Sequence, residues 1–92
     1  MSTEAAQLPE RLTLEEAGKT LAELGATLAR QAGPEVSLDA AGLREFDSSA
    51  VAVLLELRRQ LSAQGKSLRV VRWPRRLQEL VALYGVQELL PA

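Results

Sequence analysis

One apolar stripe in the middle of the chain most constrains its fold. Residues 50–61 repeat apolar side chains at the spacing of a single helical face: Ala50, Val53, Leu54, Leu57 and Leu61. Segments typical of strands lie on both sides of it, an apolar–polar alternation at 36–40 and a run of β-formers at 67–73. A strand, a helix and a strand in this order favour parallel strands joined by a right-handed crossover. The sequence therefore predicts an α/β fold.

Further elements extend this order on both sides. A brief strand is expected near Leu12, followed by a helix from Leu14 to about Ala32 that begins with a Thr13–Glu16 capping box. A last helix is expected after Pro74, with Gly85 ending it. Leu14 and Tyr84 belong to the apolar faces assigned to these two helices. A closing strand is expected at 88–90.

The chain has 92 residues, which is about one small domain. Residues 1–9 show no periodic pattern and are predicted to be a loose lead-in to a single domain at 10–92. We expect a small, mostly parallel or mixed sheet of about four short strands, packed with about three helices.

The composition excludes several functions. The chain contains no cysteine and no histidine, so it lacks disulfides, thiolate nucleophiles, the usual zinc ligands and the commonest general base. It also contains no glycine-rich phosphate-binding loop. We therefore expect no catalytic residues, no metal, no cofactor and no enzymatic activity.

The apolar runs of the sequence are only a few residues long, and its first ten residues are polar, with two acids. Neither a membrane span nor a secretory signal is indicated. We predict a cytoplasmic protein.

The junction from Phe46 to Ala50 is the first candidate site. Asp47 is suited to cap the central helix, and Ser48 and Ser49 then fall in its first turn. Unpaired N–H groups and the helix dipole at this position favour a phosphate or an added phosphoryl group. An ordinary helix cap is the alternative.

Val51 and Leu55 are one helical turn apart, on the same side of the helix as Ser48. An apolar shoulder beside a hydroxyl is what a protein-docking site needs. Alternatively, the core covers a wider face of this helix. Arg58 and Arg59 follow on the same helix and are included in the predicted partner-binding set.

Basic residues dominate the C-terminal part of the chain. Residues 1–56 hold ten acids and four bases, whereas residues 57–92 hold seven bases and two acids. The seven bases are Arg58, Arg59, Lys66, Arg69, Arg72, Arg75 and Arg76. With few aromatic residues and a pI of about 5.4, nucleic-acid binding is not expected. The bases are predicted to be a solvated face that complements an acidic partner or the chain's own acidic first helix.

Trp73, directly before Pro74, is a secondary candidate. Tryptophan is frequent at protein-binding hot spots, and a packed residue at a strand end is the alternative.

The Asp47-Ser48-Ser49-Ala50 junction, the helix after it, residues 65–70 and the ending Leu83-Tyr84-Gly85-Val86 together resemble the STAS domain family. The resemblance covers about Val36 to Leu90. It implies a single STAS domain, like the anti-sigma factor antagonists, that acts by binding a partner protein. The hydroxyls at the junction then lie on the partner-binding surface, and Ser49 matches the phosphorylation site of the sigma-regulating branch.

Two branches of the family remain open. Ala50 stands where the sigma-regulating branch usually has glycine, and the chain lacks that branch's N-terminal hairpin. The resemblance is closer to the MlaB-like STAS subunits of bacterial phospholipid-transporting ABC systems, which maintain lipid asymmetry. It implies a cytoplasmic accessory subunit that binds the transporter ATPase and reaches the inner membrane only through the transporter. The alternative is an anti-sigma factor antagonist that binds a serine kinase and is switched by phosphorylation of Ser49.

Overall fold

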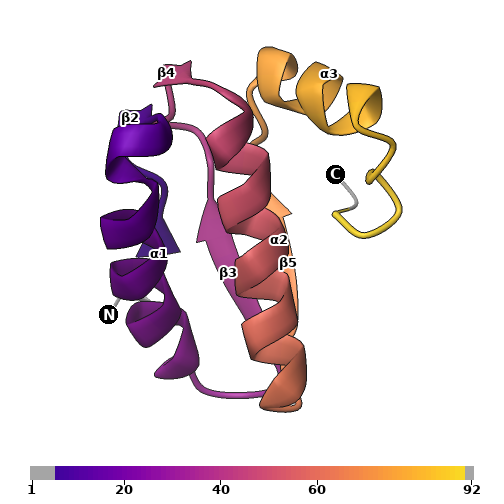
Figure 1. Cartoon of the computed structure of the whole chain (residues 1–92). Coiled ribbons are helices and arrows are strands. Elements are labelled where there is room, and N and C mark those ends of the chain that lie inside the picture. Colours follow the sequence, from indigo (N-terminus) through magenta and orange to yellow (C-terminus); the bar gives the residue numbers. More distant parts are fainter. Residues whose placement is uncertain (1–5, 91–92) are drawn as a thin grey trace.

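The computed structural model describes residues 6–90 and contains three helices and five short strands (Figure 1). In chain order these are β1 (Ala6–Gln7), β2 (Arg11–Leu12), α1 (Leu14–Ala29), β3 (Glu35–Asp39), β4 (Glu45–Phe46), α2 (Ser48–Ala63), β5 (Ser67–Val71) and α3 (Arg75–Leu83). The predicted small α/β fold is confirmed. No helix within the described residues is long and apolar enough to cross a membrane.

The strands form two parallel sheets. The larger sheet has the order β1-β3-β5, and β2 pairs with β4 in a second sheet. α1 and α2 lie side by side over one face of the larger sheet (Figure 1). Val36, Leu38 and Val70 are buried beneath them. The parallel arrangement follows from the strand–helix–strand order, because each crossover helix returns the chain to the same end of the sheet.

The expected signals define the helix ends. Thr13 N–H donates to Glu16 Oε1 at 2.8 Å in the predicted capping box of α1. Gly65 and Gly85 adopt left-handed conformations, with φ of 75° and 70°. Lys66 N–H then donates to Leu61 O at 2.8 Å, in the manner of a Schellman motif. The first helix ends at Ala29 instead of Ala32.

The predicted lead-in differs from the structure. Ala6 and Gln7 form β1, which pairs with Leu38 and Asp39 of β3, and Leu8 is only 3% exposed. Residues 1–5 of the predicted lead-in lie outside the described residues. A strand of two residues leaves no periodic pattern in the sequence, because its hydrogen bonds are made by the backbone.

The predicted closing strand at 88–90 is wrong. The N–H groups of Leu89 and Leu90 both donate to Val86 O, at 3.0 and 3.2 Å, and so make a turn. Leu90 is nevertheless buried, at 4% exposed. Leu90 lines a small hollow with Trp73 and with Val81 of α3, whereas Leu89 is 43% exposed, so the two leucines are not aligned along a strand.

Two glycine substitutions compare a glycine that ends a helix with a glycine inside one. Gly65→Ala places a Cβ on a left-handed residue and should lower the free energy of unfolding by about 1 kcal/mol. Gly18→Ala lies within α1 with no atom within 4 Å of the added Cβ, and should raise it by up to about 1 kcal/mol. Urea unfolding measures both changes. If the two substitutions changed the free energy of unfolding in the same direction, the different roles given to Gly65 and Gly18 would be contradicted.

Candidate functional site

The Asp47 carboxylate organises the start of α2. Its Oδ1 accepts the Ser49 N–H at 2.8 Å, and its Oδ2 accepts the Leu14 N–H at 3.4 Å. One side chain thus serves the first turns of both α2 and α1. The bond from Ser49 N–H is the main reason that the pKa of Asp47 is lowered. The carboxylate is therefore committed to the helix ends, as the predicted N-cap requires.

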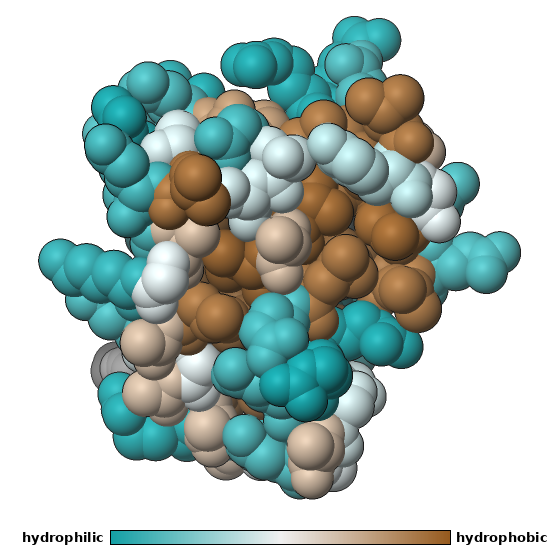
Figure 2. All heavy atoms as spheres, viewed as in Figure 1, coloured by the Kyte–Doolittle hydropathy of each residue, from teal (hydrophilic) through white to brown (hydrophobic). Residues whose placement is uncertain are grey.

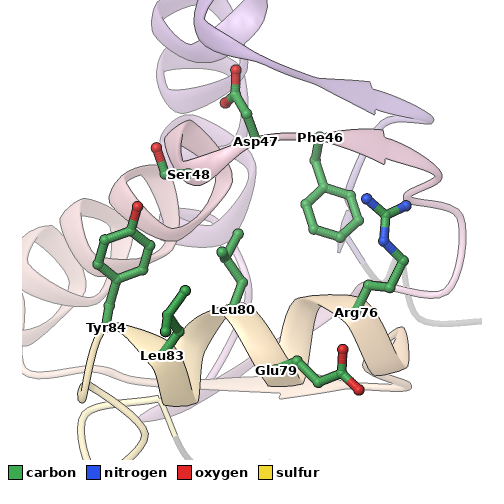
Figure 3. Close-up of a pocket in the computed structure, with 8 residues that line it drawn as sticks. All are labelled: Phe46, Asp47, Ser48, Arg76, Glu79, Leu80, Leu83 and Tyr84. Atoms are coloured by element: carbon green, nitrogen blue, oxygen red, sulfur yellow. The ribbon is translucent and has the colours of Figure 1, made fainter.

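The two serines of the junction are not equivalent. Ser48 is exposed, whereas Ser49 is half-buried and has its N–H bound by Asp47. In Figure 3, Ser48 lies on the turn of α2 that faces Tyr84. Of the two residues, Ser48 is therefore the more accessible from solvent.

A hollow of about 440 Å³ separates this turn from α3. Figure 3 shows the residues that line it: Phe46, Asp47, Ser48, Arg76, Glu79, Leu80, Leu83 and Tyr84. The Arg76 guanidinium lies 5.2 Å from the centre of the Phe46 ring, a cation–π contact that holds β4 against α3. α3 therefore supplies most of the apolar wall, and the start of α2 supplies the polar one.

Large apolar side chains are exposed on both sides of Ser48. Leu83 and Tyr84 are 77% and 54% exposed on the α3 side, and Leu14 is 77% exposed on the α1 side. The sequence predicts Leu14 and Tyr84 on buried helix faces, and this is wrong for both. Both residues lie at helix termini that extend past the core. Single exposed leucines are ordinary, but a cluster around a hydroxyl is typical of interaction sites.

A family model described as "Mlab, STAS domain" matches residues 4–91. This chain belongs to that STAS domain family. STAS domains are generally non-catalytic binding domains, and membership supports a general accessory or regulatory role. Among curated proteins, none matches the sequence at a significant level.

The predicted shoulder on α2 of the STAS domain is divided between core and surface. Val51 is only 4% exposed and belongs to the core, so its prediction as a contact residue is corrected: the core covers a wider face of α2 here. Leu55 is half-buried against the same core, and Ser48 and Leu55 lie on one side of the helix. Figure 2 shows apolar side chains gathered beside α2 on the side of α3 and the C-terminal segment. We define the Ser48 surface by six residues around the start of α2: Leu14, Asp47, Ser48, Leu55, Leu83 and Tyr84.

The predicted basic face is only partly a free surface. Among the described residues, Arg59 pairs with Glu56, Arg69 with Glu35, Arg72 with Asp39 and Arg75 with Glu79. None of these pairs involves an acid of α1, so the expected match to the acidic first helix is wrong. Glu15 and Glu16 of α1 pair with Arg11 instead. Arg58 is half-buried without a salt bridge to any described residue, and its contact with a partner stays a prediction, as does that of Arg59.

Trp73 is half-buried at the end of β5. Its Nε1–H donates to Val70 O at 3.0 Å, so the indole is fixed against the strand. The packed strand-end interpretation describes its position, and a contact with a partner protein stays a prediction.

An ion pair between the end of β3 and the residue after β5 is not indicated by any specific sequence motif. The Asp39 side chain is 8% exposed, receives the Ala41 N–H at 2.9 Å and is bound by the Arg72 guanidinium. The bond from Arg72 is the main reason that the pKa of Asp39 is lowered, and the Ala41 N–H adds to it. The only sequence signal is an acid at the end of one strand and a base after its neighbour, which is too common to be specific.

The lowered pKa of Asp39 predicts that the free energy of unfolding falls at acidic pH, which gives its pH profile an acid limb. Its contribution is fully present above the ordinary value of 3.8 and is lost as the pH falls through the lower value of the folded chain. Asp39→Asn keeps an acceptor for Ala41 but removes the charge opposite Arg72. We expect it to cost about 1 kcal/mol at neutral pH and to flatten this limb below pH 4. Thermal unfolding between about pH 2 and 7 measures the effect; an unchanged acid limb in the variant would contradict the role of Asp39.

Proposed function

We propose that this STAS domain is a non-catalytic accessory subunit that binds the ATPase of a phospholipid-transporting ABC system through the Ser48 surface. The observation that carries the proposal is the exposed hydroxyl of Ser48 between the exposed apolar side chains of Leu14 on one side and Leu83 and Tyr84 on the other. The subunit would work in the cytoplasm, at the inner membrane through the transporter.

The composition of the Ser48 surface suits protein docking. Burial of Leu83, Tyr84 and Leu14 against a partner removes apolar area from water, which supplies affinity. The Ser48 hydroxyl both donates and accepts a hydrogen bond and so fixes the register of the two proteins. The Asp47 carboxylate already binds the N–H groups of its own helices, which leaves the first turn preorganised before binding.

The choice of an ABC ATPase as the partner rests on the family. The matched model is described as "Mlab, STAS domain", and the chain resembles the lipid-transport branch in the segment Leu83-Tyr84-Gly85-Val86. In the structure this segment is the end of α3 and contributes two members of the Ser48 surface. Two of the four residues in this segment, Leu83 and Tyr84, are thus residues of the proposed interface.

The phosphorylation switch at Ser49 is less well supported by the same geometry. Ser49 is half-buried, and Asp47 Oδ1 lies 2.8 Å from its backbone nitrogen. A phosphoryl group of about −1.5 to −2 charges would stand beside this carboxylate and be repelled by it. We therefore place the contact at Ser48.

The test is a co-purification with the ATPase. Ser48→Arg inserts a long cation into the centre of the Ser48 surface and should weaken the complex by about 2 kcal/mol or more, because the charge is buried without a partner. The tagged protein is purified from its own cells, and the bound proteins are identified and quantified by mass spectrometry. Full recovery of the ATPase by this variant would refute the assigned surface.

Ser62→Arg is the matched control, because Ser62 is an exposed serine at the other end of α2. It should leave recovery of the ATPase unchanged, and both variants should unfold at the temperature of the parent. Ser49→Asp separates the alternative: loss of a serine kinase or sigma regulator with this variant would favour the phosphorylation switch.

A further inference from the structure

β5 forms one edge of the larger sheet, and no strand within residues 6–90 pairs with its outer side. Ser67 N–H donates to Pro34 O at 2.7 Å and Val71 O accepts from Ala40 N–H at 2.9 Å, so the odd-numbered residues of β5 bond to β3. In a parallel ladder the residues between them direct both backbone groups to the other side. Leu68 and Val70 therefore present their N–H and C=O groups away from the sheet.

Only one of these four outward groups has a partner among residues 6–90. Trp73 Nε1–H donates to Val70 O at 3.0 Å, at the C-terminal end of the strand. A groove of about 410 Å³ follows the same edge and is lined by Glu35 and by the residues from Leu68 to Trp73. The edge thus offers unpaired backbone groups and room beside them, which are the two requirements of strand addition.

The charge of this edge favours an acidic occupant. Arg69 and Arg72 line the groove with two positive charges and Glu35 with one negative charge, which leaves an excess of one. The Arg72 side chain is 71% exposed, whereas the Asp39 carboxylate that pairs with it is only 8% exposed, so the charge presented to solvent is mainly positive. No acid occurs in the sequence between Leu57 and Gln78.

A second copy of the chain fits this edge poorly. Two β5 strands paired antiparallel about their centres would bring Arg69 against its own counterpart, and like charges directly opposite destabilise a strand pair. Opposite an acidic residue, the same arginine stabilises the pair. Its side chain is 66% exposed, and among the described residues its one ion pair is a 3.9 Å contact with Glu35.

From these observations we infer that the outer edge of β5 is a binding site for an extended acidic peptide segment, which adds as a further strand. Leu68 and Val70 supply the backbone hydrogen bonds, and Arg69 selects for acidic side chains. The Trp73 indole occupies Val70 O in the free protein and is displaced when the strand is added. This site is separate from the Ser48 surface and does not depend on the proposed function.

The test uses a fluorescein-labelled, capped peptide of alternating glutamate and valine, followed by anisotropy at low salt with the full chain. We expect saturable binding with a Kd below about 1 mM, and at least tenfold weaker binding of the matching lysine–valine peptide. Trp73 is the only tryptophan of the chain, so its emission should change along the same binding curve. No binding of the acidic peptide, or equal binding of the two peptides, would overturn the inference.

Three comparisons sharpen the result. Arg69→Glu should reverse the preference between the two peptides, and Trp73→Phe should tighten binding about three- to tenfold, because the competing donor to Val70 O is removed. A peptide N-methylated at every residue has no backbone N–H to donate to the edge and should not bind. Equal binding of the methylated peptide, or self-association of the parent chain in sedimentation through this edge, would contradict strand addition by an acidic segment.

Ser48→Arg distinguishes this site from the proposed ATPase contact. It should bind the acidic peptide as the parent does, whatever its effect on ATPase recovery. Loss of peptide binding in this variant would place the peptide on the Ser48 surface and overturn its assignment to β5.

Discussion

Burial of the apolar stripe of α2 is the constraint that the other elements satisfy. Leu54, Leu57 and Leu61 are at most 1% exposed, and each buried side chain of this size contributes roughly 1.5 to 3 kcal/mol. α2 contacts α1, β5 and α3, so three elements distant in sequence are brought together by one helix. The direction of its first turn, and with it the position of Ser48, follows from this packing.

The same constraint explains how much of the structure could be predicted from the sequence. Periodicity and capping residues are local signals, and they located α1, α2, β3, β5 and α3 with small errors at the ends. They do not report which neighbour covers the flank of a helix. Val51 is therefore buried although it lies beside the predicted stripe, whereas Leu14 and Tyr84 are exposed although they belong to apolar patterns. β1 and the turn at 86–90 depend on backbone pairing and on single buried side chains, which leave no period to detect.

The candidate site was predictable in its centre and not at its rim. Asp47 as a cap and Ser48 in an open first turn follow from the local sequence, because both depend on backbone groups within two residues. The apolar rim depends on where α3 lies across the start of α2, a placement fixed by tertiary contacts such as Arg76 on Phe46. Half of the Ser48 surface is therefore local in origin, and half arises from packing.

The Asp39–Arg72 pair connects the two surfaces of the molecule. Arg72 has a φ of 55°, which is uncommon for a residue with a side chain, and its guanidinium is held by the buried Asp39 carboxylate. This residue turns the chain from β5 into Trp73, whose indole lies on the edge of β5, and then through Pro74 into α3, which carries Leu83 and Tyr84. The buried Asp39 carboxylate, which costs desolvation energy, is thus placed beside the sharp turn at Arg72. This turn orients both the edge of β5 and α3. The Asp39 carboxylate binds both the Ala41 N–H and the Arg72 guanidinium, so it ties the end of β3 to the residue at which the chain leaves β5.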